Sequence, residues 1–184
     1  KMVFSSMTFV PIFLPLVLIL YFAFTSPKSR NIVLLVFSLL FYAWGEPVYI
    51  LLMIFATMVD YINGMLMERF GNTKKKRTFF LCCSVVVNLS VLGFFKYADF
   101  LIRNINAVLG TTIEPLELGL PVGISFFTFQ TMSYIIDLYR GEVETEHNYF
   151  TYLTYVSMFP QLVAGPIVRF ADINAELHKR KLSF

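Results

Sequence analysis

The sequence has little charge: Asp, Glu, Lys and Arg make up 15% of its 184 residues, whereas hydrophobic residues make up 57%. Soluble domains carry about 25% charged and roughly 45–50% apolar residues. The mean hydropathy is correspondingly high, at +0.68. This small number of charges cannot cover the surface of a water-soluble domain of this length. We therefore predict that lipid is the solvent for much of the chain.

Cysteine and histidine are also scarce. Cys82 and Cys83 are adjacent in an apolar run, where neighbouring helical residues point apart and do not form a disulfide. His147 and His178 lie in polar segments, whereas a histidine that acts as a general base faces its substrate in a cleft. The sequence therefore predicts no metal site and no catalytic residue, and the absence of a basic stripe interleaved with aromatics excludes nucleic acid as a partner.

Long stretches with almost no charge recur along the chain, and most have the length of a bilayer crossing, roughly 20 residues. They cover residues 2–26, 31–45, 47–67, 78–95, 118–136 and 148–168. We predict an all-α, polytopic transmembrane protein in which residues 1–184 form one membrane domain. This domain is expected to hold about five to six membrane segments, at least one of them broken or re-entrant.

The basic residues predict the orientation of these segments. The stretch 68–78 holds five of them and is the strongest cytoplasmic signal, which places the stretch 96–117 outside as a loop. Six full crossings would divide the 15 basic residues almost evenly, so either 118–136 or 148–168 is expected to turn back within the membrane. The charge rule leaves both open, but Pro160 and Pro166 favour a break in the second.

A few polar residues interrupt the apolar segments. Asp60 and Asn63 share one face of a helix. Because Glu68 and Arg69 follow closely, we expect Asp60 to lie near the headgroups, with a position facing a partner inside the membrane as the alternative. Asn88 lies in the middle of its segment and is expected to bond a neighbouring helix.

Several longer motifs occur in a characteristic order and together cover essentially the whole chain. They are FYAW at 41–44, FFKYADF at 94–100, LPVGISFFTF at 120–129, SYIIDLYRG at 133–141 and FPQLVAGPIVRF at 159–170. This set resembles the membrane-bound O-acyltransferase (MBOAT) family, in particular its alginate O-acetyltransferase branch. The resemblance implies a ring of membrane helices around a central tunnel, and Gln130, Gln161 and Arg169 are the candidates for its wall.

The resemblance also implies an activity: an O-acetyltransferase of the bacterial inner membrane, acting in alginate biosynthesis. Such an enzyme moves an acyl group, acetyl in this branch, from a cytoplasmic thioester donor (acetyl-CoA or an acyl carrier) towards an extracytoplasmic polysaccharide such as alginate. Periplasmic polysaccharide acetyltransferases and membrane lipid are the implied partners, and no cofactor or metal is expected to be bound.

Family members are typically more than twice as long as this chain, and their catalytic histidine lies on an apolar segment in the second half. Neither His147 nor His178 matches that position, so the chain is expected to be the N-terminal portion of a longer acyltransferase fold and inactive alone. Three alternatives remain: a non-catalytic membrane scaffold that docks partner proteins, D-alanyl or peptidoglycan acyl transfer within the same family, and a small transporter or channel.

Overall fold

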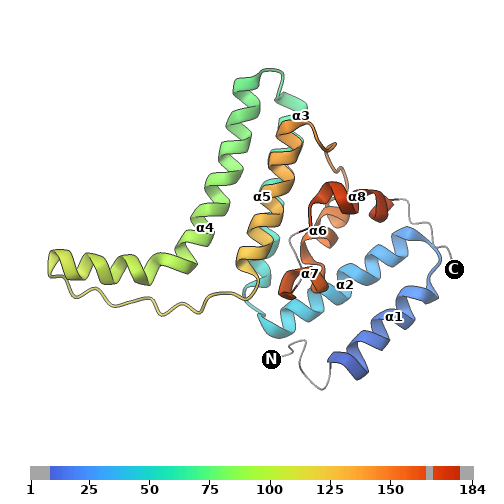
Figure 1. The fold of residues 1–184 in the computed structure, drawn as a ribbon, viewed down its shortest axis with the longest axis horizontal. Coiled ribbons are helices and arrows are strands. Elements are labelled where there is room, and N and C mark those ends of the chain that lie inside the picture. Colours follow the sequence, from blue (N-terminus) through green and yellow to red (C-terminus); the bar gives the residue numbers. More distant parts are fainter. Residues whose placement is uncertain (1–8, 165–167, 179–184) are drawn as a thin grey trace.

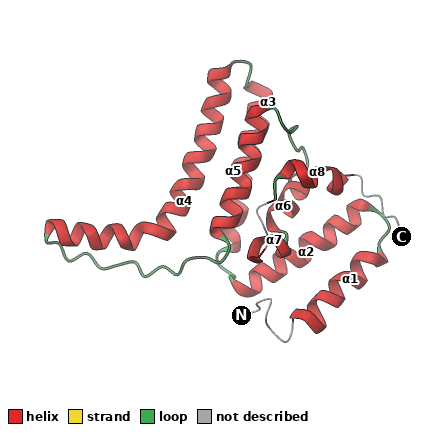
Figure 2. Ribbon diagram, in the orientation of Figure 1, coloured by secondary structure: helices red, strands yellow, loops and turns green. Residues whose placement is uncertain are grey.

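The computed structural model describes residues 9–164 and 168–178, and these residues form helices joined by loops, with no strand among them (Figure 2). The expected all-α fold is thus confirmed for this part. The elements are η1 (Phe9–Phe13), α1 (Leu14–Ala23), α2 (Pro27–Gly45), α3 (Ile50–Phe70), α4 (Lys74–Leu109), α5 (Ile124–Arg140), α6 (Tyr149–Ser157), α7 (Phe159–Ala164) and α8 (Phe170–His178).

Helices α3, α4 and α5 pack side by side, and α2, α6, α7 and α8 lie against them (Figure 1). In the described part, α3 and α4 are the two helices that are long and apolar enough to cross a membrane. The apolar helix at 11–23 is shorter. The membrane character expected from composition therefore has support in two helices, whereas α5 and α6 are each shorter than a full crossing.

Arg77, in the first turn of α4, fastens that helix to the end of α5. Its Nη2 donates hydrogen bonds to the carbonyl oxygens of Leu138 and Tyr139, at 2.9 and 3.1 Å. These carbonyls belong to the last turn of α5, where backbone acceptors lack partners within the helix and a cation is favourable. Arg77 thus joins α4 to α5 at one end of the bundle. This end carries the basic residues of the stretch 68–78, which we call the basic cluster.

The segment 148–168 is broken, as its prolines predicted. Helix α6 ends at Ser157, Met158 is not helical, and α7 begins at Phe159. Pro160 therefore lies in the first turn of α7, where a proline is tolerated because its missing N–H would have no partner in any case. Pro166 lies outside the described residues. The other candidate for a break, 118–136, contains no interruption once α5 has begun at Ile124.

The predicted loop at 96–117 is wrong over most of its length, because α4 continues without interruption to Leu109. The charges of Lys96, Asp99 and Arg103 end the apolar run but do not end a helix. The first residue that does so is Gly110, whose φ of +67° is the left-handed conformation typical of a glycine that ends a helix.

The core has two parts, both rich in aromatic rings. The larger lies among α3, α5, α6 and α8 and includes Met53, Phe127, Tyr134 and Tyr152, which are fully buried. The smaller joins η1, α2 and α7 through a cluster of phenylalanine rings whose centroids lie 5.4 to 6.0 Å apart, and α1 adds Val17 to it. Its members are Phe9, Phe13, Phe37, Phe41 and Phe159.

Gly64 lets α3 approach α5 closely. A Cβ atom added there would lie 3.3 Å from Leu138 Cδ2 and 3.5 Å from the Tyr134 hydroxyl. We expect Gly64→Leu to force the two helices apart and to cost about 1–3 kcal/mol, the usual penalty of overpacking. Gly93→Leu is the matched control, because nothing lies within 4 Å of a Cβ at that position. Unfolding of the purified variants by SDS in mixed micelles measures the difference, and equal stability of the two variants would contradict the close packing.

Candidate functional site: buried polar residues between the helices

A buried carboxylate lies at the centre of the packed helices. Asp60, in the middle of α3, is completely buried, and Asn88 Nδ2 on α4 donates to both of its carboxylate oxygens at 2.8 Å. The Ser84 hydroxyl, one turn before Asn88, also donates to Asp60. The helix face of Asp60 thus points at α4 and places the carboxylate between polar partners, which was the alternative in the sequence analysis, whereas its position near the headgroups stays a prediction.

Helix α5 joins this network through Thr131. Its hydroxyl lies 3.3 Å from Asn88 Oδ1 and 3.1 Å from the carbonyl oxygen of Thr128, both of which are acceptors. Asn88 thus bonds neighbouring helices on two sides, as predicted. A network in which each polar group finds a partner on another helix fixes how three apolar helices meet.

Two of the predicted wall residues are in direct contact. Gln130 on α5 is 1% exposed, and its Nε2 donates to Gln161 Oε1 on α7 at 3.0 Å. The pair joins a continuous helix to the short helix that follows the break at Met158. The structure thus brings together two side chains that lie 31 positions apart in the sequence.

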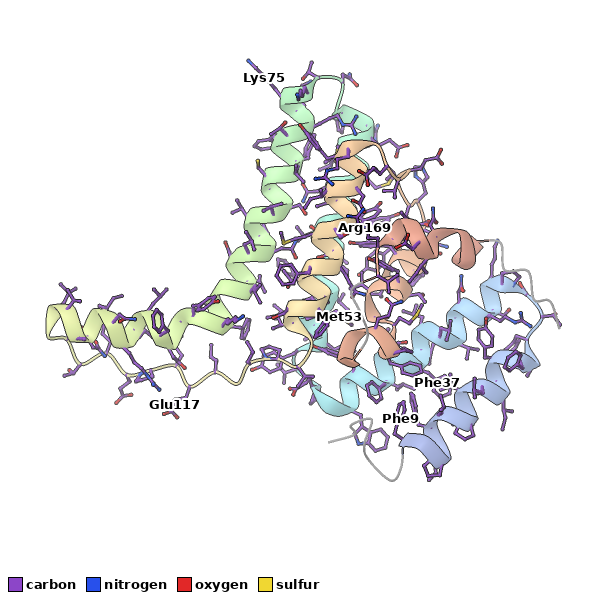
Figure 3. The ribbon with its side chains drawn as sticks, viewed as in Figure 1. Phe9, Phe37, Met53, Lys75, Glu117 and Arg169 are labelled. Atoms are coloured by element: carbon purple, nitrogen blue, oxygen red, sulfur yellow. The ribbon has the colours of Figure 1, made fainter. Side chains whose placement is uncertain are left out.

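The third wall residue, Arg169, lies elsewhere. It precedes α8, its side chain is more than half exposed, and its Nη1 lies 3.7 Å from a carboxylate oxygen of Glu142 (Figure 3). Glu142 is in the loop after α5 and also faces Arg140, at 3.9 Å. Arg169 therefore takes part in an exposed ion-pair cluster and not in the buried contact of the two glutamines.

Four buried polar atoms on α5 and α6 have no hydrogen-bond partner among the described residues. They are Thr128 Oγ1, Gln130 Oε1, Tyr152 OH and Ser157 Oγ, from helices α5 and α6. A buried polar atom without a partner costs about 1–3 kcal/mol, so native proteins satisfy nearly all of them with protein or water. Such atoms, one of which belongs to Gln130 itself, mark places where water or a polar substrate group can bind.

Sequence reasoning overlooked three of the buried polar residues described above: Ser84, Tyr152 and Ser157. Ser84 could have been found, since it lies four residues before Asn88 and therefore on the same helix face. Tyr152 and Ser157 had no such signal, because tyrosine and serine are common in membrane helices and interfaces.

A hollow with a volume of about 480 Å³ lies beside Arg77, at the ends of α3 and α5. Its polar lining includes Glu68, Glu144 and His147. His147 is on the surface, and its Nε2 lies 3.6 Å from a carboxylate oxygen of Glu68. The described residues hold no group of three or more His, Cys, Asp or Glu that could bind a metal ion. The buried polar residues can thus position and bind polar groups, and the described side chains do not pair a nucleophile with a histidine there.

Over nearly its whole length the chain is similar to bacterial O-acetyltransferases. The probable alginate O-acetylase AlgI of Pseudomonas aeruginosa is 39% identical over 183 residues, which is 97% of this chain and 35% of that protein. The protein of the same name from Azotobacter vinelandii is also 39% identical, and the chain covers 36% of it. The peptidoglycan O-acetyltransferase of Helicobacter pylori is 30% identical over 200 residues, 94% of this chain and 38% of that protein.

These relatives confirm the resemblance to the alginate O-acetyltransferase branch of the MBOAT family. The chain spans 35% of the length of the first of them. No family model matches the sequence, and no solved structure matches the fold.

Proposed function

We propose that this chain is part of an inner-membrane O-acetyltransferase that moves an acetyl group from a cytoplasmic thioester towards an extracytoplasmic polysaccharide, with alginate as the first candidate. The similarity of 97% of the chain to alginate O-acetylases carries the proposal. In this proposal the catalytic base comes from outside residues 1–184, so the chain alone is inactive, and periplasmic acetyltransferases receive or pass on the acetyl group.

The role of these residues is to form part of the wall where donor and acceptor meet. The thioester and the hydroxyl start on opposite sides of the membrane and must reach a place from which bulk water is excluded. The glutamine pair and the neighbouring atoms without partners supply hydrogen-bonding groups in an otherwise apolar part of the bundle. The hollow at Arg77 supports an approach of the donor from the end that carries the basic cluster.

The topology that we propose has five to six membrane segments, with the broken helix pair α6 and α7 as the segment that turns back. The break at Met158 and the 9- and 6-residue lengths of the two helices support this, since neither is long enough to cross alone. Broken backbone at membrane depth is tolerated where protein or a polar cavity surrounds it.

A second acceptor deserves a parallel test. The Helicobacter pylori relative is named peptidoglycan O-acetyltransferase, and the same wall could serve a hydroxyl of that polymer. The donor half of the reaction is the same for both acceptors. The two candidates are separated by the polymer that gains ester-linked acetyl groups.

The wall role predicts a large effect of removing the glutamine amides together. In the complete protein, we expect the double variant Gln130→Leu/Gln161→Leu to transfer acetyl at least about tenfold more slowly, because misplacement or loss of a positioning contact raises the barrier. The measurement is the acetyl content of alginate and of peptidoglycan in a strain that lacks its own O-acetylase, at equal amounts of membrane protein.

The matched control is Asn63→Leu, because the Asn63 amide bonds the carbonyl of Val59 on its own helix. We expect it to keep near wild-type transfer. Normal transfer by the glutamine variant would contradict the wall role while leaving the enzyme proposal intact. If the unaltered complete protein acetylates neither polymer, the acetyltransferase proposal fails and a scaffold function becomes the better explanation.

A further inference from the structure

The second half of α4 leaves the bundle as an arm, which we define as residues 94–123. After its apolar first half, α4 changes direction and its last turns run away from α3 and α5 (Figure 1). A loop then returns beneath it to the start of α5. The arm lies at the end of the bundle far from Lys75, and Glu117 lies on the returning loop (Figure 3).

The helix of the arm is amphipathic. Phe94, Leu101, Ile105 and Val108 recur at helical spacing on one face and are 52%, 55%, 42% and 81% exposed. At 100° per residue, Arg103 falls on the opposite face, and its side chain is exposed. Four large apolar side chains thus form an open stripe, which we call the apolar stripe.

The returning loop is attached to a different side of the helix. Asp99 Oδ1 accepts a hydrogen bond from the backbone N–H of Leu116 at 2.7 Å. Asn106 binds both backbone groups of Ile113, its Oδ1 accepting from the N–H at 3.0 Å and its Nδ2 donating to the carbonyl at 2.7 Å. Asp99 and Asn106 are seven residues apart and so share a face. The loop therefore leaves the apolar stripe uncovered by the described residues.

We propose that the arm lies in the plane of the membrane surface, with the apolar stripe buried in the boundary between lipid headgroups and acyl chains. The arm continues directly from a helix whose stretch 78–95 has no charge and the length of a crossing. A helix that leaves such a crossing with one apolar and one cationic face fits an interfacial helix, which inserts by about 5–10 Å. Lys96 and Arg103 then reach lipid phosphates.

This proposal concerns the arm, at the end of the bundle far from Lys75, and does not depend on the acetyltransferase function. The occupant of the stripe is lipid, because the arm continues directly from a helix that is long and apolar enough to cross a membrane. Phe100 and Leu109, which are 63% and 69% exposed, add apolar surface beside the stripe.

Spin labels on single cysteines test this assignment. The complete protein, with every native cysteine replaced by alanine (Cys82 and Cys83 included), is labelled at residue 101, 105 or 108 and placed in vesicles of phosphatidylethanolamine and phosphatidylglycerol. We expect these labels to be relaxed by oxygen, which concentrates in lipid, and shielded from a water-soluble nickel chelate. The control label at residue 103 is expected to show the reverse order.

High nickel access at the three stripe positions would overturn the proposal, because the stripe would then face water. Low access to both relaxing agents would also overturn it, because protein would then cover the stripe. A second measurement leaves the cysteines in place: Val108→Trp, in a background where Trp44 and every other tryptophan of the complete protein are replaced by phenylalanine, is expected to lose more than half of its fluorescence in vesicles of brominated lipid. No quenching there would equally reject the lipid contact.

Discussion

Replacing Asn88 by leucine is expected to destabilise the protein by about 3 kcal/mol or more, the largest effect of any single polar substitution in the bundle. The variant removes the amide that donates to both carboxylate oxygens of Asp60, a group that is completely buried between α3 and α4. The Ser84 hydroxyl still donates to that carboxylate, but the amide that reached both of its oxygens is gone. A buried charged group that lacks its partners keeps the full free-energy cost of its removal from water. This cost lowers the free energy of unfolding of the variant.

A double-mutant cycle gives this prediction its sharpest test. Asp60→Leu/Asn88→Leu removes both partners and is expected to be closer to wild-type stability than Asn88→Leu, because apolar replacement of both members of a buried pair is nearly neutral. Unfolding in SDS mixed micelles gives the free energies, with Asn63→Leu as the control within about 0.5 kcal/mol of wild type. If the double variant is as unstable as the sum of the two single variants, Asn88 and Asp60 do not act as a pair.

The Asp60 network also shows what the charge pattern along one helix leaves undecided. The sequence predicts a carboxylate near the headgroups because Glu68 and Arg69 follow within about two turns. What decides the outcome is the facing helix, where Ser84 and Asn88 share one face. Depth along a single helix can be estimated from its own sequence, but the partner across the interface depends on how three helices pack.

The arm illustrates the same limit for an element boundary. The first charge after the apolar run, Lys96, predicts where the chain leaves the membrane. The end of the helix is a separate matter, decided by Gly110. A search for helix-ending residues and for helical spacing of the apolar residues would have extended the predicted helix to Leu109.

The break in 148–168 could be predicted because proline acts locally, through a missing N–H and a fixed φ angle. The contact between Gln130 and Gln161 could not, since it depends on how α7 sits on α5 after that break. Naming both glutamines as wall residues rested on family resemblance and on their polarity in apolar segments. Arg169 was named on the same grounds, yet it lies beside Glu142 on the surface, directly before α8 begins.

Phe170→Ala is expected to cost about 3–5 kcal/mol and to release α8 from the bundle. Phe170 is the first residue of α8 and is fully buried. Its ring lies edge-on against Tyr134 and Tyr155, with centroids 5.0 and 5.2 Å apart. The Tyr155 hydroxyl also donates to the carbonyl oxygen of Val168 at 2.8 Å, so the same tyrosine holds the backbone just before the helix.

The stability lost in Phe170→Ala comes from a cavity among rings on three helices. The surrounding side chains fill this cavity only partly. Phe170→Leu keeps most of the volume and is expected to cost less than half as much. Phe150→Ala is the matched control, since that ring is 65% exposed and its removal opens no cavity. Hydrogen exchange of the backbone at 170–178 reports the attachment of α8 directly. If exchange there stays as slow in Phe170→Ala as in wild type, contacts other than this ring hold α8 on the bundle, and the aromatic cluster is not its anchor.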